Sequence, residues 1–221
     1  MTVRKTAAKS DAALKSAVVE AALPHIAFDG FADRLMARAA KEAGAGKDDM
    51  LRLFPDGARS LLEAISESVD AEMEKRLGKL KLSAMPVRAR IATAVKTRLA
   101  ILKPHKEAAR RAVAHLTLPP NVPLGTKLVY RTVDAMWRAA GDVSTDFNFY
   151  SKRAILAGVY SATLMRWFTD VSEDESATDA FLAARIENVM QFEKLKSRMR
   201  DQAKKLPSLS DVLSGFAARR S

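Results

Sequence analysis

Residues 131–170, RTVDAMWRAAGDVSTDFNFYSKRAILAGVYSATLMRWFTD, decide the fold because they predict two helices joined by a polar corner. The first helix, over about Leu124–Ala140, has apolar side chains at the spacing of a buried helical stripe. Gly141 ends it, because glycine enters the left-handed conformation at a helix C-terminus without steric cost. The stripe consists of Leu124, Leu128, Val129, Thr132, Val133, Met136, Trp137 and Ala140.

The second helix, Ala154–Phe168, is apolar on nearly every face, and Arg166 is its only charged residue. A helix of this kind lies at the centre of a core or against another apolar body. It is shorter than the roughly 20 residues that a membrane span requires, and Ser161 and Thr163 interrupt it. We therefore expect the central helix of a helical domain. Periodicity alone leaves open whether this helix only fills a core or also lines a ligand cavity.

The corner between the helices is polar. Asp142, Ser144, Thr145 and Asp146 can accept hydrogen bonds from the free N–H groups of a new helix. An acid/base pair of Asp142 and Asp146 is the alternative, but neighbouring hydroxyl residues at a helix junction favour capping.

Composition bounds the function. A chain of 221 residues can bury a substantial core, as one large domain or two small ones. The absence of cysteine excludes disulfides, thiolate metal sites and cysteine nucleophiles. No H-E-x-x-H, E-x-x-H or G-x-S-x-G motif occurs, and GAGK at 44–47 lacks the spacing of a phosphate-binding loop. The residues therefore indicate a binding protein, with no cofactor and no metal.

Charge favours an anionic partner, because 37 basic and 26 acidic residues give a net charge of +11. No acidic residue occurs between Lys79 and Lys106, and we interpret this stretch as a basic face that docks on an anionic membrane, although a merely solvated face is the alternative. A helix predicted from Pro86 should bury Val87, Ile91, Val95, Leu99 and Leu102. The basic residues are Lys79, Lys81, Arg88, Arg90, Lys96, Arg98, Lys103 and Lys106, of which Arg88, Lys96 and Arg98 are expected off that stripe.

The N-terminal third predicts three short helices and a long one. The first has helical spacing from Leu14 that runs into Pro24. With LRLFPDGARSLL at 51–62, this layout resembles that of TetR-type regulators, whose DNA-reading helix would fall near 47–54. Asp48 and Asp49 are unfavourable beside phosphates and more consistent with helix capping. Nucleic acid is therefore not the expected partner.

The tail predicts a short amphipathic helix with a basic end, of the kind that lies in a lipid interface. A helix packed back on the protein is the alternative. Its apolar residues are Leu209, Val212, Leu213 and Phe216, followed by Arg219 and Arg220. The expected parts are an N-terminal part at 1–83, a helical lipid-binding part at 84–206 and this tail at 207–221.

A more specific resemblance comes from WRAAGDVSTDFNFYSKRAILAGVYSATL at 137–164, AALPHIAFDGFADRL at 21–35 and FPDGARSLL at 54–62. These segments resemble the ninth COQ-type family, the accessory lipid-binding proteins of ubiquinone (coenzyme Q) biosynthesis. The distinctive pattern G-D-x-S-T-D-F-N-x-Y-[ST]-[KR]-R falls at 141–153. Phe149 stands where the family commonly has tryptophan. The short N-terminus favours a bacterial form, cytoplasmic and peripheral at the inner membrane.

The resemblance implies an all-α, TetR-like fold, with an N-terminal helix-turn-helix-like bundle, a helical ligand-binding part whose family-specific core is at about 117–192, and a homodimeric assembly. It implies a non-catalytic role in which an isoprenoid lipid or ubiquinone precursor is bound and presented at the membrane to the di-iron demethoxyubiquinone hydroxylase. A TetR-type transcriptional regulator with a hydrophobic effector is the alternative, and an enzyme with an unrecognised acid/base pair is the third hypothesis.

Two sets of site residues follow from that role. The apolar second helix facing Met136 and Trp137 can line a cavity for an isoprenoid tail, where each buried CH₂ gains about 0.8 kcal/mol. The expected lipid-binding residues are Met136, Trp137, Leu156, Val159, Tyr160, Leu164, Trp167 and Phe168. The expected partner-binding residues are Asp142, Ser144, Thr145, Asp146, Asn148, Phe149, Tyr150, Lys152 and Arg153.

Overall fold

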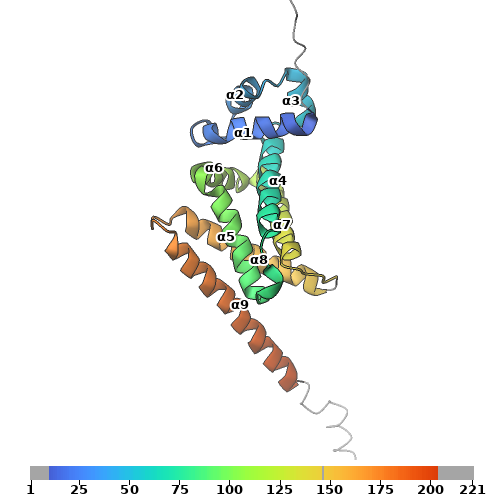
Figure 1. The fold of residues 1–221 in the computed structure, drawn as a ribbon, viewed down its shortest axis with the longest axis vertical. Helices are drawn as coiled ribbons and strands as arrows, with labels where there is room; N and C mark the ends of the chain where they lie inside the picture. Colours follow the sequence, from blue (N-terminus) through green and yellow to red (C-terminus); the bar gives the residue numbers. More distant parts are fainter. Residues whose placement is uncertain (1–9, 146, 204–221) are drawn as a thin grey trace, which may run out of the picture.

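A computed structural model describes residues 10–145 and 147–203, and α-helices form nearly all of this part of the chain (Figure 1). The predicted all-α fold class is confirmed. The helices are α1 (Asp11–Asp29), α2 (Asp33–Ala43), α3 (Lys47–Leu53), α4 (Ala58–Leu77), α5 (Val87–Leu102), α6 (Lys106–Leu116), α7 (Val122–Ala139), α8 (Phe147–Phe168) and α9 (Ser176–Ala203). Short 3-10 turns at Leu82–Ala84, Lys103–His105 and Pro119–Asn121 join some of them.

Two hydrophobic cores share one connecting helix. The first core joins α1, α2 and α3 to the start of α4 through residues such as Ile26, Leu35 and Leu61. The second joins the end of α4 to α5, α7, α8 and the start of α9, with Met73 and Trp167 among its buried residues. Figure 1 shows α1–α3 as a small bundle at one end of α4, with α7 alongside α4 and α8 and α9 towards its other end. This arrangement is consistent with the TetR-like layout that the sequence predicts.

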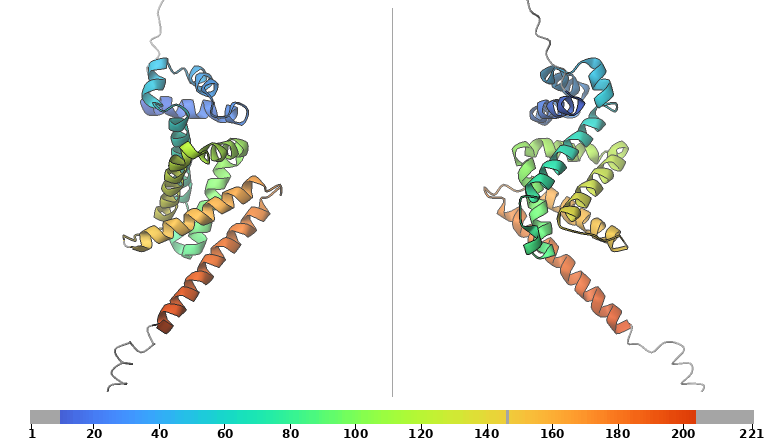
Figure 2. Two further views of the ribbon diagram at one scale, coloured as in Figure 1. Left: turned by 180° about the vertical axis from the view of Figure 1, so that it is seen from behind. Right: turned by 45° about the vertical axis from the view of Figure 1, so that its right-hand side comes forward.

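Helix α8 is central to the larger core, as predicted, because it packs on α6, α7 and α9. It begins at Phe147, earlier than the apolar stretch alone indicated. The helix before it ends as expected, with Gly141 at a φ of +83°. In the two views of Figure 2, the second half of α9 extends away from the other helices. None of the described helices is long and apolar enough to cross a membrane.

Helix α1 differs from its prediction at Pro24. The helix does not end there but continues through Pro24 to Asp29. Proline removes one helical hydrogen bond and crowds the preceding turn, but burial of Val18, Ala22 and Ile26 on both sides of Pro24 holds the helix together. Tertiary packing outweighs the local breaker here.

Helices α4 and α7 run side by side and are joined by three ion pairs in one register. Glu63–Lys127, Glu67–Arg131 and Glu74–Arg138 have N···O distances of 2.7, 2.9 and 3.1 Å. These side chains are substantially exposed, so each pair contributes at most about 1 kcal/mol. Their common spacing along both helices fixes how α7 lies against α4, and therefore where α7 delivers the corner that follows it.

Several predicted positions lie outside the described residues. They are Asp146 of the corner and the tail residues Leu209, Val212, Leu213, Phe216, Arg219 and Arg220. The amphipathic helix expected at 207–221 therefore stays a prediction.

Candidate functional site

The corner between α7 and α8 is held by a buried carboxylate. Asp142 lies within 2.8 Å of Lys152 Nζ and 3.2 Å of Arg153 Nη1, and Ser144 Oγ donates to it at 2.6 Å. Burial alone would raise the pKa of Asp142, but the hydrogen bonds from Lys152, Ser144 and Arg153 outweigh it and lower the pKa to about 2. Asp142 thus stays ionised at neutral pH and is an ion-pair partner rather than the helix cap that the sequence suggested.

Arg153 is the second centre of this corner. It is 2% exposed, and its Nε donates to Asp134 at 2.6 Å while Nη1 donates to the Phe149 carbonyl at 3.1 Å. Its guanidinium lies 3.4 Å from the centre of the Phe149 ring. The aromatic residue at position 149 therefore stacks on a cation, a contact that phenylalanine and tryptophan can both make.

The predicted partner-binding set is divided by this geometry. Asp142 and Arg153 face inward and shape the corner, and Ser144, Phe149 and Lys152 are half-buried. Thr145 and Tyr150 are exposed, Tyr150 to 64%, and the neighbouring Val143 is 90% exposed. The side chain of Asn148 is outside the description, as is Asp146. A partner that docks here would meet Val143, Thr145 and Tyr150 first.

A cavity of about 330 Å³ lies between α4, α5, α6, α7 and α8, with α1 at its edge; we call it the central cavity. This volume is at the lower end of the range for small-molecule sites, about 300–1,000 Å³. Most of its lining is aliphatic. Representative residues are Leu62, Ile65, Leu102, Val113, Leu116 and Leu128.

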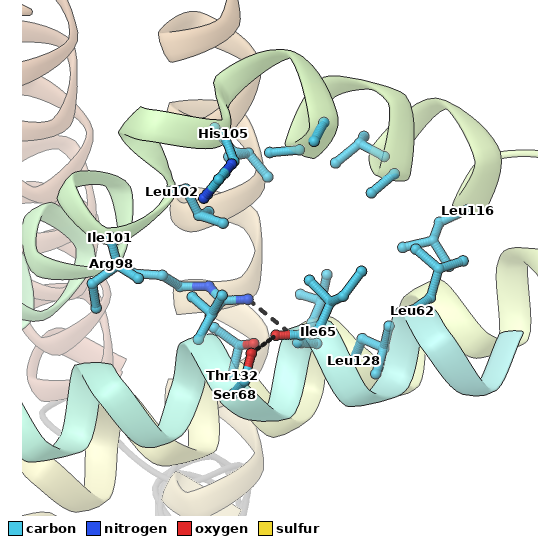
Figure 3. A pocket seen from close by; sticks show the side chains of 18 of the residues that line it. Leu62, Ile65, Ser68, Arg98, Ile101, Leu102, His105, Leu116, Leu128 and Thr132 are labelled. Carbon is cyan, nitrogen blue, oxygen red and sulfur yellow. Dashed lines mark hydrogen bonds between the residues drawn. The ribbon is translucent and has the colours of Figure 1, made fainter. Parts of the chain in front are cut away.

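One end of the central cavity is polar. Figure 3 shows Arg98, Ser68, Thr132 and His105 towards one end, and Leu62, Leu116 and Leu128 towards the other. A cavity with this asymmetry fits an amphipathic ligand, with its polar group at the Arg98 end and its apolar body at the Leu116 end.

Arg98 organises the polar end. It is 6% exposed; its Nη1 lies 2.5 Å from Asp70 Oδ1, its Nε donates to the Tyr160 hydroxyl at 2.8 Å, and its Nη2 approaches Ser66 Oγ at 3.5 Å. Thr132 donates to both oxygens of Asp70, at 3.1 and 3.0 Å. Burial raises the pKa of Asp70 above its ordinary value, although the adjacent guanidinium acts in the opposite direction.

The prediction that Arg98 lies off the buried stripe of α5 is wrong. Ile91, Val95 and Leu99 are buried as expected, and Arg98 is buried with them. Position 98 is three residues after Val95 and four before Leu102, so it shares the stripe. Val87, also expected inside, is exposed because it starts the helix at the edge of the core.

The interpretation of the stretch 79–106 as basic charge without acidic partners is wrong for three of its eight basic residues. Arg98 pairs with Asp70, Lys96 with Asp179 at 2.6 Å, and Lys103 with Glu175 at 3.6 Å. These acids come from other parts of the chain, which a reading of the stretch alone does not reveal. Two other basic residues of the stretch bind backbone carbonyls. Arg90 donates to those of Ser83, Met85 and Ala140, and Lys106 donates to that of Asp170.

The basic residues of this stretch for which the described part of the chain shows neither an acidic partner nor a backbone carbonyl lie at the α4–α5 turn. The side chains of Lys79, Lys81 and Arg88 are exposed, and none of the side chains that the structure describes forms an ion pair with them. Leu80, Met85 and Val87 are exposed between them. We call these six residues the turn patch. Cations interleaved with exposed apolar side chains fit an anionic lipid surface.

A second hollow, the α8–α9 groove, has a volume of about 540 Å³ and lies on the other side of α8. It is lined by residues of α5, α8 and α9 that include Ile91, Ile155, Ile186 and Met190, with Arg88 and Lys152 among the polar residues. Val87 and Arg88 belong both to this groove and to the turn patch, so the two are continuous.

The predicted lipid-binding residues do not surround one cavity. Tyr160 and Leu164 line the central cavity, whereas Trp137, Leu156 and Val159 line the α8–α9 groove. Met136 and Trp167 are fully buried, and Phe168 packs against the same core, without lining either hollow. The sequence did not indicate that α4, α5 and α6 also line the central cavity. For α5 a signal was present in Arg98, a charged residue at the spacing of a buried stripe.

Helix α3 keeps its acidic start. Asp49 accepts a hydrogen bond from the Gly46 N–H at 3.1 Å, which confirms the predicted capping role for this residue. Arg52 is engaged by Asp11 and Asp49. Asp48 remains exposed in the first turn, where it would repel a phosphate backbone.

The described residues also bear on metal chemistry. Among the side chains that the structure describes, no group of three or more histidine, aspartate or glutamate residues is arranged to hold a metal ion.

The fold and the site define an all-helical, TetR-like protein with an amphipathic cavity in its larger core. In a comparison with known protein families, the family model described as COQ9 matches residues 122–193, which include α7, α8 and much of α9. The chain is 31% identical over 188 residues to the mitochondrial ubiquinone biosynthesis protein COQ9 of Homo sapiens, covering 82% of this chain and 59% of that protein.

Two further relatives show how widely the similarity extends. COQ9 of Bos taurus is 32% identical over 188 residues (82% of this chain, 59% of the relative), and a probable coq9 of Dictyostelium discoideum is 25% identical over 190 residues (83% and 62%). The chain thus carries a COQ9 family domain at residues 122–193 and is about 31% identical to COQ9 ubiquinone biosynthesis proteins over most of its length. It spans about 60% of the length of the curated relatives it matches.

Proposed function

We propose that this chain is a non-catalytic accessory protein of ubiquinone biosynthesis, which binds an isoprenoid or quinone intermediate and presents it at the membrane to a biosynthetic hydroxylase. The observation that carries the proposal is the central cavity, aliphatic along most of its lining and polar at the Arg98 end. The names of the relatives, ubiquinone biosynthesis proteins, supply the pathway.

The energetics of such a ligand agree with this cavity. Each CH₂ group buried against Leu62, Leu116 or Leu128 gains about 0.8 kcal/mol. A volume of about 330 Å³ accommodates a ring with the first part of its tail rather than a long polyprenyl chain. The rest of a long tail would need another apolar surface.

The ion pairs and hydrogen bonds of the two candidate acids, Asp142 and Asp70, support a presenting role rather than a catalytic one. Asp142, with a pKa of about 2, is held by Lys152 and Arg153 and is a poor proton donor or acceptor near neutral pH. Asp70 is bound by Arg98 and Thr132.

Presentation requires a partner surface and a membrane surface. We place the hydroxylase contact at the exposed side of the α7–α8 corner, around Thr145 and Tyr150, and the membrane contact at the turn patch together with the tail at 207–221. The assembly is proposed as a homodimer, peripheral at the bacterial inner membrane.

The first test is organic extraction of the purified native protein followed by mass spectrometry. A quinone or polyprenyl species near one equivalent per chain is expected. The variant Ala109→Phe, which adds a ring to the α6 wall of the central cavity, should reduce that amount severalfold, whereas Ile155→Phe in the α8–α9 groove should not. Trace phospholipid alone, from wild type and both variants, would contradict the proposal.

The regulator alternative has a separate test. We expect only weak DNA binding that is lost as salt rises, because the +11 charge attracts phosphate without sequence readout. Nanomolar, sequence-dependent binding at about 0.15 M salt would instead establish a transcriptional regulator.

A further inference from the structure

We infer that Arg98 and Tyr160 form a head-group site at the polar end of the central cavity, which selects ligands carrying an uncharged oxygen acceptor such as a ring carbonyl. The inference depends on the proposed function for the existence of an apolar ligand in this cavity. What it adds is the chemical class of the ligand's polar group and the side chains that recognise it.

The first support is the number of donors on Arg98. A guanidinium has five N–H donors in a fixed plane. Among the side chains that the structure describes, three hydrogen bonds use them: to Asp70, to Tyr160 and, at the long distance of 3.5 Å, to Ser66. Two N–H groups are therefore left over on a side chain that is 6% exposed and lines the cavity. Buried donors without an acceptor are costly, so a ligand oxygen placed there gains more than it would at an exposed arginine.

The second support is the hydroxyl proton of Tyr160. Its oxygen accepts from Arg98 Nε at 2.8 Å, which leaves the proton free to donate elsewhere. No acceptor for that proton occurs among the described residues. Tyr160 is 3% exposed and lines the same cavity. Arg98 and Tyr160 thus offer adjacent unused donors at one end of an otherwise aliphatic space.

The third support concerns charge. Arg98 is already neutralised by Asp70 at 2.5 Å, so the cluster has no excess positive charge with which to bind an anion. Glu72 lines the same cavity, but it is paired with Arg76 at 2.8 Å and Lys75 at 3.6 Å, so it leaves no free charge for a ligand either. Burying a carboxylate or phosphate head here would leave it without a counter-charge, which is strongly unfavourable. A neutral carbonyl or phenolic oxygen needs only the free donors.

The rest of the cavity sets the body of the ligand. Beyond the polar end the lining is aliphatic, with Leu62, Leu116 and Leu128 at the far end. The geometry therefore orients a ring with its oxygen at Arg98 and its tail towards Leu116.

The test compares three probes of similar size on the lipid-stripped full-length chain: a geranyl-substituted benzoquinone, geranylbenzene and farnesoate. Dissociation constants are measured by competition with one common fluorescent apolar probe. We expect wild type to bind the quinone about tenfold more tightly than geranylbenzene, as one or two buried hydrogen bonds allow. Farnesoate should bind more weakly than the quinone, and the reverse order would overturn the assignment of a neutral head group.

The decisive variant is Tyr160→Phe, which removes only a hydroxyl. Its affinity for the quinone should fall roughly three- to tenfold, with affinity for geranylbenzene unchanged. Tyr130→Phe, the same change at a half-exposed residue of α7, is the matched control and should alter neither. Equal losses for both probes in Tyr160→Phe, or no loss, would overturn the head-group site. If wild type binds none of the three probes, it is the proposed function that fails instead.

Discussion

At the scale of single residues, two charged clusters have different tasks, one at the α7–α8 corner and the other between α4 and α5. The cluster of Asp142, Lys152 and Arg153 closes a corner and leaves its carboxylate with three donors. The cluster of Asp70 and Arg98 lies beside a cavity and keeps unused donors. Fully satisfied polar groups stabilise a structure, whereas partly satisfied ones can serve a ligand.

The corner cluster predicts a pH-dependent stability. Asp142→Asn should lower the free energy of unfolding at pH 7 by roughly 3 kcal/mol, because Lys152 and Arg153 lose a buried partner. The folded-state pKa, about 2, is below the unfolded value of 3.8, so this contribution is present above pH 4 and is lost as pH falls towards 2. Urea denaturation at pH 7 and pH 3 should therefore show a smaller difference for the variant than for wild type.

The control for this prediction is Asp48→Asn, on the exposed first turn of α3, which should change stability by less than about 0.5 kcal/mol. Identical pH profiles for Asp142→Asn and wild type would show that Asp142 does not stabilise the corner.

Gly141 predicts a second residue-scale effect. Alanine there should destabilise the protein by about 1 kcal/mol, because φ is +83° and a Cβ would lie 3.5 Å from Arg90 Nη1. Gly158→Ala, in the interior of α8 with open space around it, should stabilise by about as much. Thermal unfolding of the two variants should move in opposite directions, and a shift of the same sign in both would contradict this account.

At the scale of helices, α1 contains a locally unfavourable residue that its packing overrides. Pro24→Ala should increase stability by about 1 kcal/mol, since it restores a helical hydrogen bond on an exposed face, with part of the gain offset by a more flexible unfolded chain. Chemical denaturation measures the change. Pro55→Ala, outside any helix between α3 and α4, should give no comparable gain.

Much of the helical layout could be predicted from the sequence, because glycine, proline and periodic apolar residues act locally. Gly141 ends α7 as expected, and the helix predicted from Pro86 begins directly after it as α5. Pro24 is the exception, because distant packing decides there.

The candidate site could be predicted only in part. An all-apolar α8 indicates burial on every side but does not say which side adjoins a hollow, so only Tyr160 and Leu164 of the predicted set line the central cavity. Arg98 was misplaced because its partner, Asp70, lies on another helix. Asp142 was interpreted as a cap for the same reason, since Lys152 and Arg153 reach it only after α8 folds back.

At the scale of the whole molecule, charge that looks continuous in the sequence is concentrated by folding into one patch. The double variant Lys79→Gln/Lys81→Gln should weaken binding to anionic vesicles roughly 10- to 30-fold at low salt, because each lysine near such a surface contributes on the order of 1 kcal/mol. Vesicle co-sedimentation at two salt concentrations measures it, and raising salt should reduce the difference.

The charge-matched control is Lys96→Gln/Lys127→Gln, in which both lysines are paired internally, with Asp179 and Glu63. It removes the same net charge but should weaken vesicle binding much less. Equal losses in the two double variants would mean that net charge, rather than the turn patch, governs attraction to the membrane.

Helix α8 separates the two hollows: Tyr160 and Leu164 face one, while Leu156 and Val159 face the other. Suppose that filling the central cavity shifts this helix and changes the affinity of the groove for whatever binds there. Reciprocity of binding free energies then requires an occupant of the groove to change the affinity of the cavity by the same factor. Under that coupling, a molecule bound in the groove would weaken ligand binding in the central cavity and promote release of that ligand without contacting it.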